Sequence, residues 1–362
     1  MKLRIPIFSL TVLLLLSHGW AAQETDLGPP LWTEVVLDKQ AAGEESDWLP
    51  NKYALFSLDR EALTIVLEQA PMEFVKAAAS LPVIELPAPD GKLTRFLFEE
   101  SPILSEKLSL QYPEIRTYRA HGLDDPTLTT RFDLTSSGFH AMIFSTDGTW
   151  LIDPHPGGDD LYMVYRKRDA QTGEPFRCLV EDSESAVQEP LDILAKISPN
   201  NPSGTELRTY RLAVTSTDEY WVWADGIGST AANQISTTFN RVTGIYERDL
   251  AISFVIVCLN IYDNDPPGSD PFINDVNGTL LDDNNDDLNS TCGSGNYDLG
   301  HLVSQGGGGG LAACGACRSN KGRGATSRGN PRFDTPMTTF TRGASTRFSP
   351  TGRLETGAPV EL

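Results

Sequence analysis

Apolar and polar residues alternate over short distances between residues 51 and 165, which favours β-strands in the first half of the chain. The turn signals Ser137-Gly138 and Asp147-Gly148 separate several of the apolar runs, as they do in hairpins. Asp59–Ser80 has its apolar residues at helical spacing, so it predicts a helix before these strands. The clearest strand predictions are Lys92–Phe98, Thr130–Leu134, Phe139–Phe144 and Thr149–Ile152.

The pattern changes in the second half of the chain, where strands and helices are expected to alternate. Leu207–Thr215 alternates as a strand, and Ala251–Ile261 is a nearly continuous apolar run that predicts a central strand buried on both faces. Between them, Ala231–Asp249 predicts an amphipathic helix with one apolar face, Ile235, Phe239, Val242, Ile245 and Tyr246. A second helix over Leu280–Ser290 and a third strand over Leu299–Ser304 complete a β-α-β-α-β order, which implies an α/β sheet.

Local composition divides the chain into segments. Ser198–Gly204 is rich in Pro, Asn, Ser and Gly and predicts a linker between two domains. The sequence therefore predicts a fold of the mixed α+β and α/β classes. Its expected segments are a mobile, polar leader at 23–50, a β-rich domain at 51–197, the linker at 198–204, a second domain at 205–317 and a basic tail at 318–362.

The first residues have the form of a secretory signal peptide. Met1–Arg4 is basic, Ile5–Leu16 is mostly apolar, and Gly19–Ala21 offers small residues for cleavage, so residues 1–22 are expected to be removed on export. About a dozen apolar residues are too few to span a bilayer, which needs roughly 20. The net charge of −20 disfavours nucleic acid and anionic membranes as partners. We expect a secreted monomer without a membrane span.

Five cysteines follow the leader, Cys178, Cys258, Cys292, Cys314 and Cys317, and in an exported protein some are expected to pair. Arg166, Lys167 and Arg168 form a basic cluster in an acidic chain, which is either a processing site or a solvated surface cluster. Between Asp263 and Asp298 there are nine Asp and no Lys or Arg. Such an oxygen-rich segment suits calcium, although it lacks EF-hand spacing, and a solvated acidic loop is the alternative.

Several ordered blocks carry a resemblance to a known family. One set lies in the β-rich half: Leu86–Gly91, Phe98–Pro102, Tyr112–Tyr118, Gly138–Met142 and Ile152–Pro154. A second set lies in the other half: Gly204–Arg211, Asn240–Leu250 and Tyr297–His301 with the glycine run after it. From about residue 85 to 325 the chain resembles bacterial secreted reprolysin-like zinc metallopeptidases of the metzincin group, with their propeptide.

The resemblance implies a zymogen that hydrolyses peptide bonds in polypeptide substrates with a zinc-activated water. It identifies the substrate-edge strand and the loop after it as Leu299, Gly300, His301, Leu302, Val303, Ser304, Gly306, Gly307 and Gly308. Main-chain pairing along such an edge binds extended peptides. The resemblance also suggests that the Cys178 thiolate acts as a zinc ligand that blocks the zymogen, and a disulfide or buried thiol is the alternative.

The family's zinc motif, H-E-x-x-H, is absent from the printed sequence, and no two of its five histidines lie within four residues of each other. We therefore name no catalytic or metal-binding residue and expect no peptidase activity from the chain as printed. Residues 318–353 hold eight basic residues and one acid, which indicates either a disordered tail or a reading-frame error. Two non-catalytic alternatives remain, an exported, calcium-dependent binding module and a peptide-binding pseudoenzyme.

Overall fold

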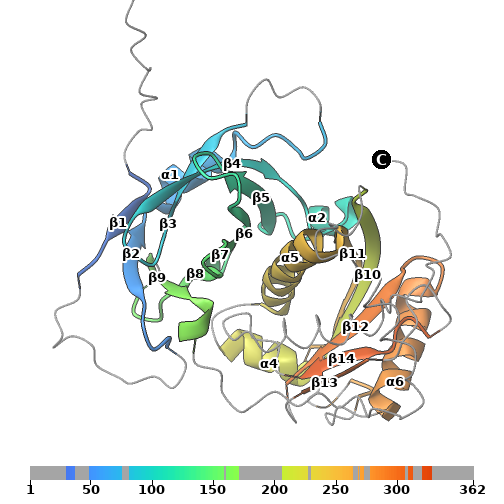
Figure 1. Ribbon diagram of the computed structural model, residues 1–362. Helices are drawn as coiled ribbons and strands as arrows, with labels where there is room; N and C mark the ends of the chain where they lie inside the picture. The colour runs from blue at the N-terminus through green and yellow to red at the C-terminus, as the bar shows by residue number, and fades with distance from the viewer. Residues whose placement is uncertain are drawn as a thin grey trace, which may run out of the picture. The chain divides into compact units, whose positions relative to one another are not determined.

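A computed structural model describes residues 30–36, 49–75, 81–158, 160–170, 206–226, 230–263, 268, 270–272, 278–305, 309–312 and 320–327. The chain divides into Met1–Pro30 and Leu31–Leu362, and the described helices and strands lie in the second unit. They form a nine-stranded and a five-stranded sheet with accompanying helices (Figure 1). The prediction of a mixed α+β fold is confirmed. Among the described residues, no helix has the length and apolar character needed to cross a bilayer.

The nine-stranded sheet is antiparallel throughout and has the order β1-β2-β9-β8-β7-β6-β5-β4-β3. One face packs around a core that contains Trp32, Phe96, Phe132 and Phe139. Figure 1 shows that the sheet curls, which brings its outer strands β1 and β3 near each other. Its strands are β1 (Trp32–Glu34), β2 (Ala54–Leu58), β3 (Val83–Pro87), β4 (Leu93–Glu100), β5 (Arg116–Gly122), β6 (Thr129–Thr135), β7 (Gly138–Phe144), β8 (Trp150–Pro154) and β9 (Leu161–Arg166).

Two predictions for this half need correction. Strand β1 lies inside the segment expected to be a polar leader, because Trp32 supplies an aromatic side chain that the core buries. The first helix, α1 (Arg60–Leu67), begins at its cap Asp59 as expected but ends well before Ser80. Pro71 explains this end, since proline and the residue before it disfavour helix. A second short helix, α2 (Glu106–Gln111), precedes β5.

The five-stranded sheet has the order β11-β10-β12-β14-β13. Neighbours pair in parallel except β13, which runs antiparallel to β14. Its strands are β10 (Arg208–Ser216), β11 (Ile252–Ile261), β12 (Leu299–Ser304), β13 (Gly309–Ala312) and β14 (Gly324–Ser327). The helices of this half are α4 (Asp218–Gly226), α5 (Ala231–Leu250) and α6 (Gly278–Leu288), followed by the short π-helix η3 (Asn289–Gly293).

Helix α5 agrees with its prediction. Thr230 caps its start by accepting a hydrogen bond from the Asn233 N–H, and Ala251 ends it in a left-handed conformation at φ 52°. Its predicted apolar face packs against the sheet core, with Ile235, Phe239, Val242 and Tyr246 buried.

The structure decides three other expectations for this half. Strand β11 is an outer strand of its sheet, not a central one. The helix predicted over Leu280–Ser290 is present as α6, so the alternative of an acidic loop over Asp282–Asp287 does not hold; Leu280, Leu281 and Leu288 give that helix a buried face. The basic tail expected from residue 318 onward instead begins with an ordered turn and strand β14. Thr326 and Ser327 are buried there, so β14 belongs to the sheet core.

Candidate functional site

The predicted substrate-edge strand lies inside the sheet. Strand β12 pairs with β10 on one side and β14 on the other, so its backbone groups are already used. His301 is buried, its Nε2 lies 2.7 Å from the Thr326 hydroxyl, and its ring meets Phe239 edge to face. His301 is thus a buried side chain of strand β12. The prediction that Leu299–Ser304 forms the edge is wrong, because β14 covers it.

Gly300 shows how tightly β12 is covered. Its N–H donates to the carbonyl of Lys321 at 2.8 Å, which brings the turn before β14 directly onto β12. A Cβ atom at Gly300 would lie 2.7 Å from the Gly322 Cα and 2.4 Å from a Leu288 methyl. Only glycine fits this approach, so the glycine in the Asp-Leu-Gly-His block serves packing inside the sheet.

The outer strand on this side is β13. It pairs with β14 only, so among the described residues its other side has no strand partner. Its sequence, Gly309-Gly-Leu-Ala312, places little side-chain bulk beside the backbone. An open, glycine-rich strand edge can accept an extended peptide by main-chain hydrogen bonds. Sequence reasoning missed this strand because three small residues and one leucine give no alternating pattern; the glycine run beside it was the available signal.

The other predicted site residues are spread over the chain. Gly306, Gly307, Gly308, Cys178, Cys314 and Cys317 lie outside the described residues. Arg166 ends strand β9, where it pairs with Trp150, while Lys167 and Arg168 begin a 3-10 turn. A protease at this cluster would first have to unfold the end of β9, because processing enzymes bind their substrates extended. The processing site remains a prediction.

The histidines do not form a metal site in the described part of the chain. His140 bonds Asp133, His155 faces Tyr53, and His301 faces Thr326. Each partner lies in a different part of the fold. The family's zinc, which needs histidines on one helix face, therefore does not fit the described residues.

Three carboxylates do come together at the end of β10. Asp218, Glu219 and Asp270 offer oxygen atoms that lie within 4.8 Å of one another. The Asp218 N–H donates to Asp270 at 2.8 Å, and the Gly268 N–H donates to Asp218 at 2.6 Å. Burial raises the pKa of Asp270, and the Asp218 charge adds to the rise. Oxygen ligands of this kind suit calcium. Asp270 belongs to the acidic segment from which the sequence suggested calcium binding. The other two carboxylates, Asp218 and Glu219, lie outside that segment, at the start of α4.

The stability contributed by Asp270 is expected to depend on pH and calcium. Because its pKa is raised in the folded state, the neutral form stabilises the fold below the unfolded pKa of about 4, and this contribution is lost as pH rises through the folded pKa. Relative to Asp270→Asn, the wild-type melting temperature should therefore fall as pH rises from about 4 to 7. At pH 7, calcium should raise the melting temperature of the wild type only. A difference that is constant with pH would contradict the prediction.

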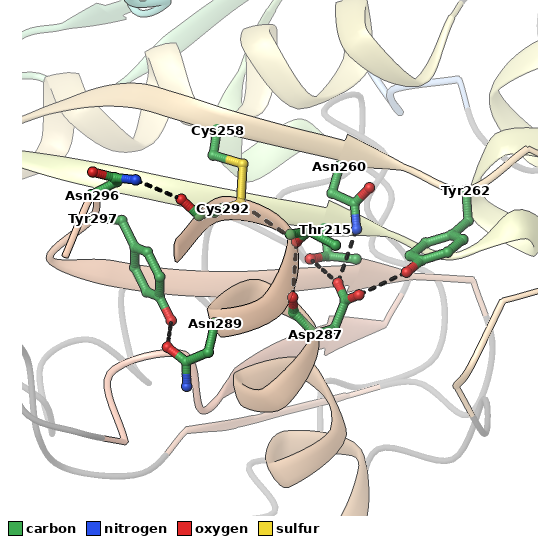
Figure 2. The surroundings of a disulfide bond; sticks show 10 residues. Thr215, Cys258, Asn260, Tyr262, Asp287, Asn289, Cys292, Asn296 and Tyr297 are labelled. Carbon is green, nitrogen blue, oxygen red and sulfur yellow. Dashed lines mark hydrogen bonds between the residues drawn. A yellow bond between two sulfur atoms is a disulfide. The ribbon is translucent and has the colours of Figure 1, made fainter. Parts of the chain in front are cut away.

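A disulfide joins the outer strand β11 to the helix that follows α6. Cys258 and Cys292 are 34 residues apart in sequence with Cα atoms 5.9 Å apart. Figure 2 shows that Asp287, beside the disulfide, accepts hydrogen bonds from Asn260, Tyr262 and Thr215. The Tyr297 hydroxyl donates to Asn289 at 2.9 Å on the same helix end (Figure 2). The expectation of a disulfide is thus met by this pair.

The second half of the molecule is a mixed sheet with an antiparallel outer strand, which is consistent with a metzincin-like domain. The comparisons give the same class. A model of metallo-peptidase family M12B, reprolysin-like, matches residues 232–342, which confirms the resemblance predicted from the sequence over this region. This match continues into the segment that was expected to be a tail. The curated proteins gave no match.

Among solved structures, the chain is similar to metalloproteinase-II from Bacteroides fragilis. The identity is 12% and the TM-score 0.42, and the alignment covers 79% of this chain and 84% of that one. The family match supports a metallopeptidase domain over residues 232–342.

Proposed function

We propose that this chain is the precursor of an exported, zinc-dependent metalloendopeptidase of the reprolysin-like kind. The observation that carries this proposal is the family match over residues 232–342, which runs from α5 through β14. The signal-like residues 1–22 support export. The nine-stranded domain before the matched region takes the place of the propeptide.

In this function an extended polypeptide lies along the side of β13 that has no strand partner in the described part of the chain, and its main chain pairs with Gly309–Ala312. In the intact family, a bound zinc ion would supply the Lewis acid for peptide hydrolysis. The described residues do not provide the ligands for it, so no catalytic step is assigned to them. We propose that the chain as printed binds peptides without cutting them.

Sequencing the coding DNA from Gly306 to beyond Leu362 tests the precursor hypothesis. An H-E-x-x-H sequence in a restored frame would support it, and a confirmed frame would favour a peptide-binding pseudoenzyme. A casein-cleavage assay of the printed chain, with and without EDTA, tests the proposed inactivity. Cleavage that EDTA abolishes would contradict the proposal that this chain does not cut peptides.

A calcium-dependent binding module is the second candidate, favoured by the cluster of Asp218, Glu219 and Asp270. The two candidates differ in a simple measurement. Calcium should raise the melting temperature strongly if the cluster is the functional site. If the function lies at β13 instead, an extended peptide should raise the melting temperature and calcium should leave it unchanged.

A further inference from the structure

We propose that residues 31–170 form a separable domain that recognises residues 206–327 as its partner, and that the two stay bound after the chain between them is cut. The docking surface on the second region is the polar face of α5 together with the outer side of β11. This inference rests on side-chain contacts and does not depend on peptidase activity.

Helix α5 has two buried faces of opposite character. Its apolar face packs on the five-stranded sheet, and its other face carries polar residues at helical spacing. That polar face, Asn233, Thr237, Asn240, Arg241, Gly244 and Glu247, would ordinarily face water on a surface helix. Here Asn233, Asn240 and Arg241 are each at most 1% exposed, because the nine-stranded sheet covers them.

Arg131 of β6 makes the most extensive contact with this face. Its guanidinium donates to Glu247 at 2.9 and 2.6 Å and to the Asn240 side-chain oxygen at 3.0 Å. It also donates to Ser101 within its own domain at 2.9 Å. Arg131 is buried, and Glu247 and Asn240 supply most of its direct hydrogen bonds, so separating the domains would remove its hydrogen-bonded carboxylate.

A second group of polar contacts extends along the helix. The Thr237 hydroxyl donates to Asp133 at 2.8 Å, and Asn240 donates to the Phe132 carbonyl at 3.0 Å. Arg241 donates to Asp153 of β8 at 2.6 Å. Side chains and backbone of β6 and β8 thus hold the polar face of one helix in a fixed register.

Asn233 fixes the beginning of α5 in the same way. Its amide donates to the Ser136 and Ser137 hydroxyls at 2.7 and 2.8 Å, in the turn between β6 and β7. At the other end, a Cβ on Gly244 would lie 2.9 Å from the Phe144 ring, so the absence of a side chain allows β7 to approach the helix closely.

The outer side of β11 provides the apolar part of the contact. The Ile256 N–H donates to the Ile103 carbonyl at 2.7 Å, and the Ser105 N–H donates to the Ile256 carbonyl at 2.9 Å. Ile103, Leu104 and Leu108 join the core around β10 and β11. The first domain therefore covers the outer strand of the second, as an added strand does in peptide recognition.

These features are those of an interface between separate proteins. An apolar part provides affinity, and charged pairs fix orientation and partner choice. Separating the two domains would let water hydrate the polar face of α5, but it would also expose the apolar side chains of Ile103, Leu104 and Leu108. Cleavage of the connecting chain should therefore leave a complex, and release should require a further step.

A cleavable full-length chain tests this. A site-specific protease sequence with glycine–serine spacers is inserted between Gly204 and Thr205, and complete cutting is verified on a denaturing gel. We expect the two pieces to co-elute from a size-exclusion column at micromolar concentration and about 0.15 M salt. Separate elution of the cut wild-type pieces would overturn the proposal.

Variants show whether the polar face holds the complex. Arg131→Met and, separately, Glu247→Gln should each weaken the affinity of the cut pieces at least about 30-fold in a dilution series. Arg95→Met is the matched control, because its partner Asp124 lies in the same domain and the pair is exposed. The affinity between the cut pieces of this variant should stay within about threefold of the wild-type affinity. If Arg131→Met does not fold, Glu247→Gln, which keeps the side-chain size, carries the test. Unchanged affinity in the variants that fold would refute the role of this face.

Discussion

Asp153→Asn is expected to lower the free energy of unfolding by about 3–5 kcal/mol, because it removes one charge of a fully buried ion pair. Arg241 and Asp153 are 1% and 0% exposed, with 2.6 Å between Nη2 and Oδ1. Burial by itself lowers the pKa of Arg241, but the carboxylates of Asp153 and Asp133 outweigh it and raise that pKa above its usual value. The variant therefore leaves the Arg241 cation buried without its hydrogen-bonded carboxylate, with Asp133 as the nearby acidic group that remains.

Asparagine keeps the shape of the side chain, so the effect reports the charge. The Tyr165 hydroxyl also donates to Asp153, at 2.7 Å, and the amide of asparagine can accept at one oxygen only. Urea denaturation followed by circular dichroism measures the loss. Asp90→Asn is the control, since its salt bridge to Lys92 is exposed and should contribute less than about 1 kcal/mol.

A double-mutant cycle separates the pair from its surroundings. Arg241→Met alone should also destabilise, whereas Arg241→Met with Asp153→Asn should destabilise less than the sum of the two, because no buried charge then lacks its partner. Additive losses would show that the two charges do not stabilise each other. A loss for Asp153→Asn as small as that for Asp90→Asn would contradict the burial of this pair.

The apolar half of α5 could be predicted from the sequence, but its polar half could not. Periodicity identifies which residues avoid water, and it placed Ile235, Phe239 and Val242 on one face. It gives no sign that Asn240 and Arg241 are buried too. Their partners lie on β6 and β8, with Arg131 and Glu247 116 residues apart in sequence. The sequence around a polar residue that a distant segment buries looks the same as the sequence around a polar residue exposed to solvent.

The strand Leu299–Ser304 was predicted correctly, and its place in the sheet was not. Its position depends on β14, whose sequence Gly-Ala-Thr-Ser has little intrinsic strand preference. That segment is basic and rich in glycine, so composition indicated a tail. Pairing with β12 and β13 makes it a strand. Sheet order depends on such non-local pairing. The sequence therefore predicted β12 as the edge strand, whereas β13 is the outer strand of the described sheet.

Removing the disulfide, by Cys258→Ala with Cys292→Ala, should lower the free energy of unfolding by about 4 kcal/mol. This value follows from the entropy of closing a loop of 34 residues in the unfolded chain. The native contacts around it should persist, because Asp287 keeps its hydrogen bonds from Asn260 and Tyr262 (Figure 2). The variant is therefore expected to fold with a lower urea midpoint.

Reduction of the wild type with dithiothreitol provides an independent measurement of the same crosslink. The reduced protein should unfold at the midpoint of the double-alanine variant, while dithiothreitol should leave the variant itself unchanged. Asp287→Asn in the reduced protein then separates the two links between α6 and the sheet, since it weakens the hydrogen bonds without altering the loop. A reduced wild type that keeps its midpoint would show that the 258–292 crosslink does not constrain the unfolded chain, and that the hydrogen bonds to Asp287 alone hold this helix end on the sheet.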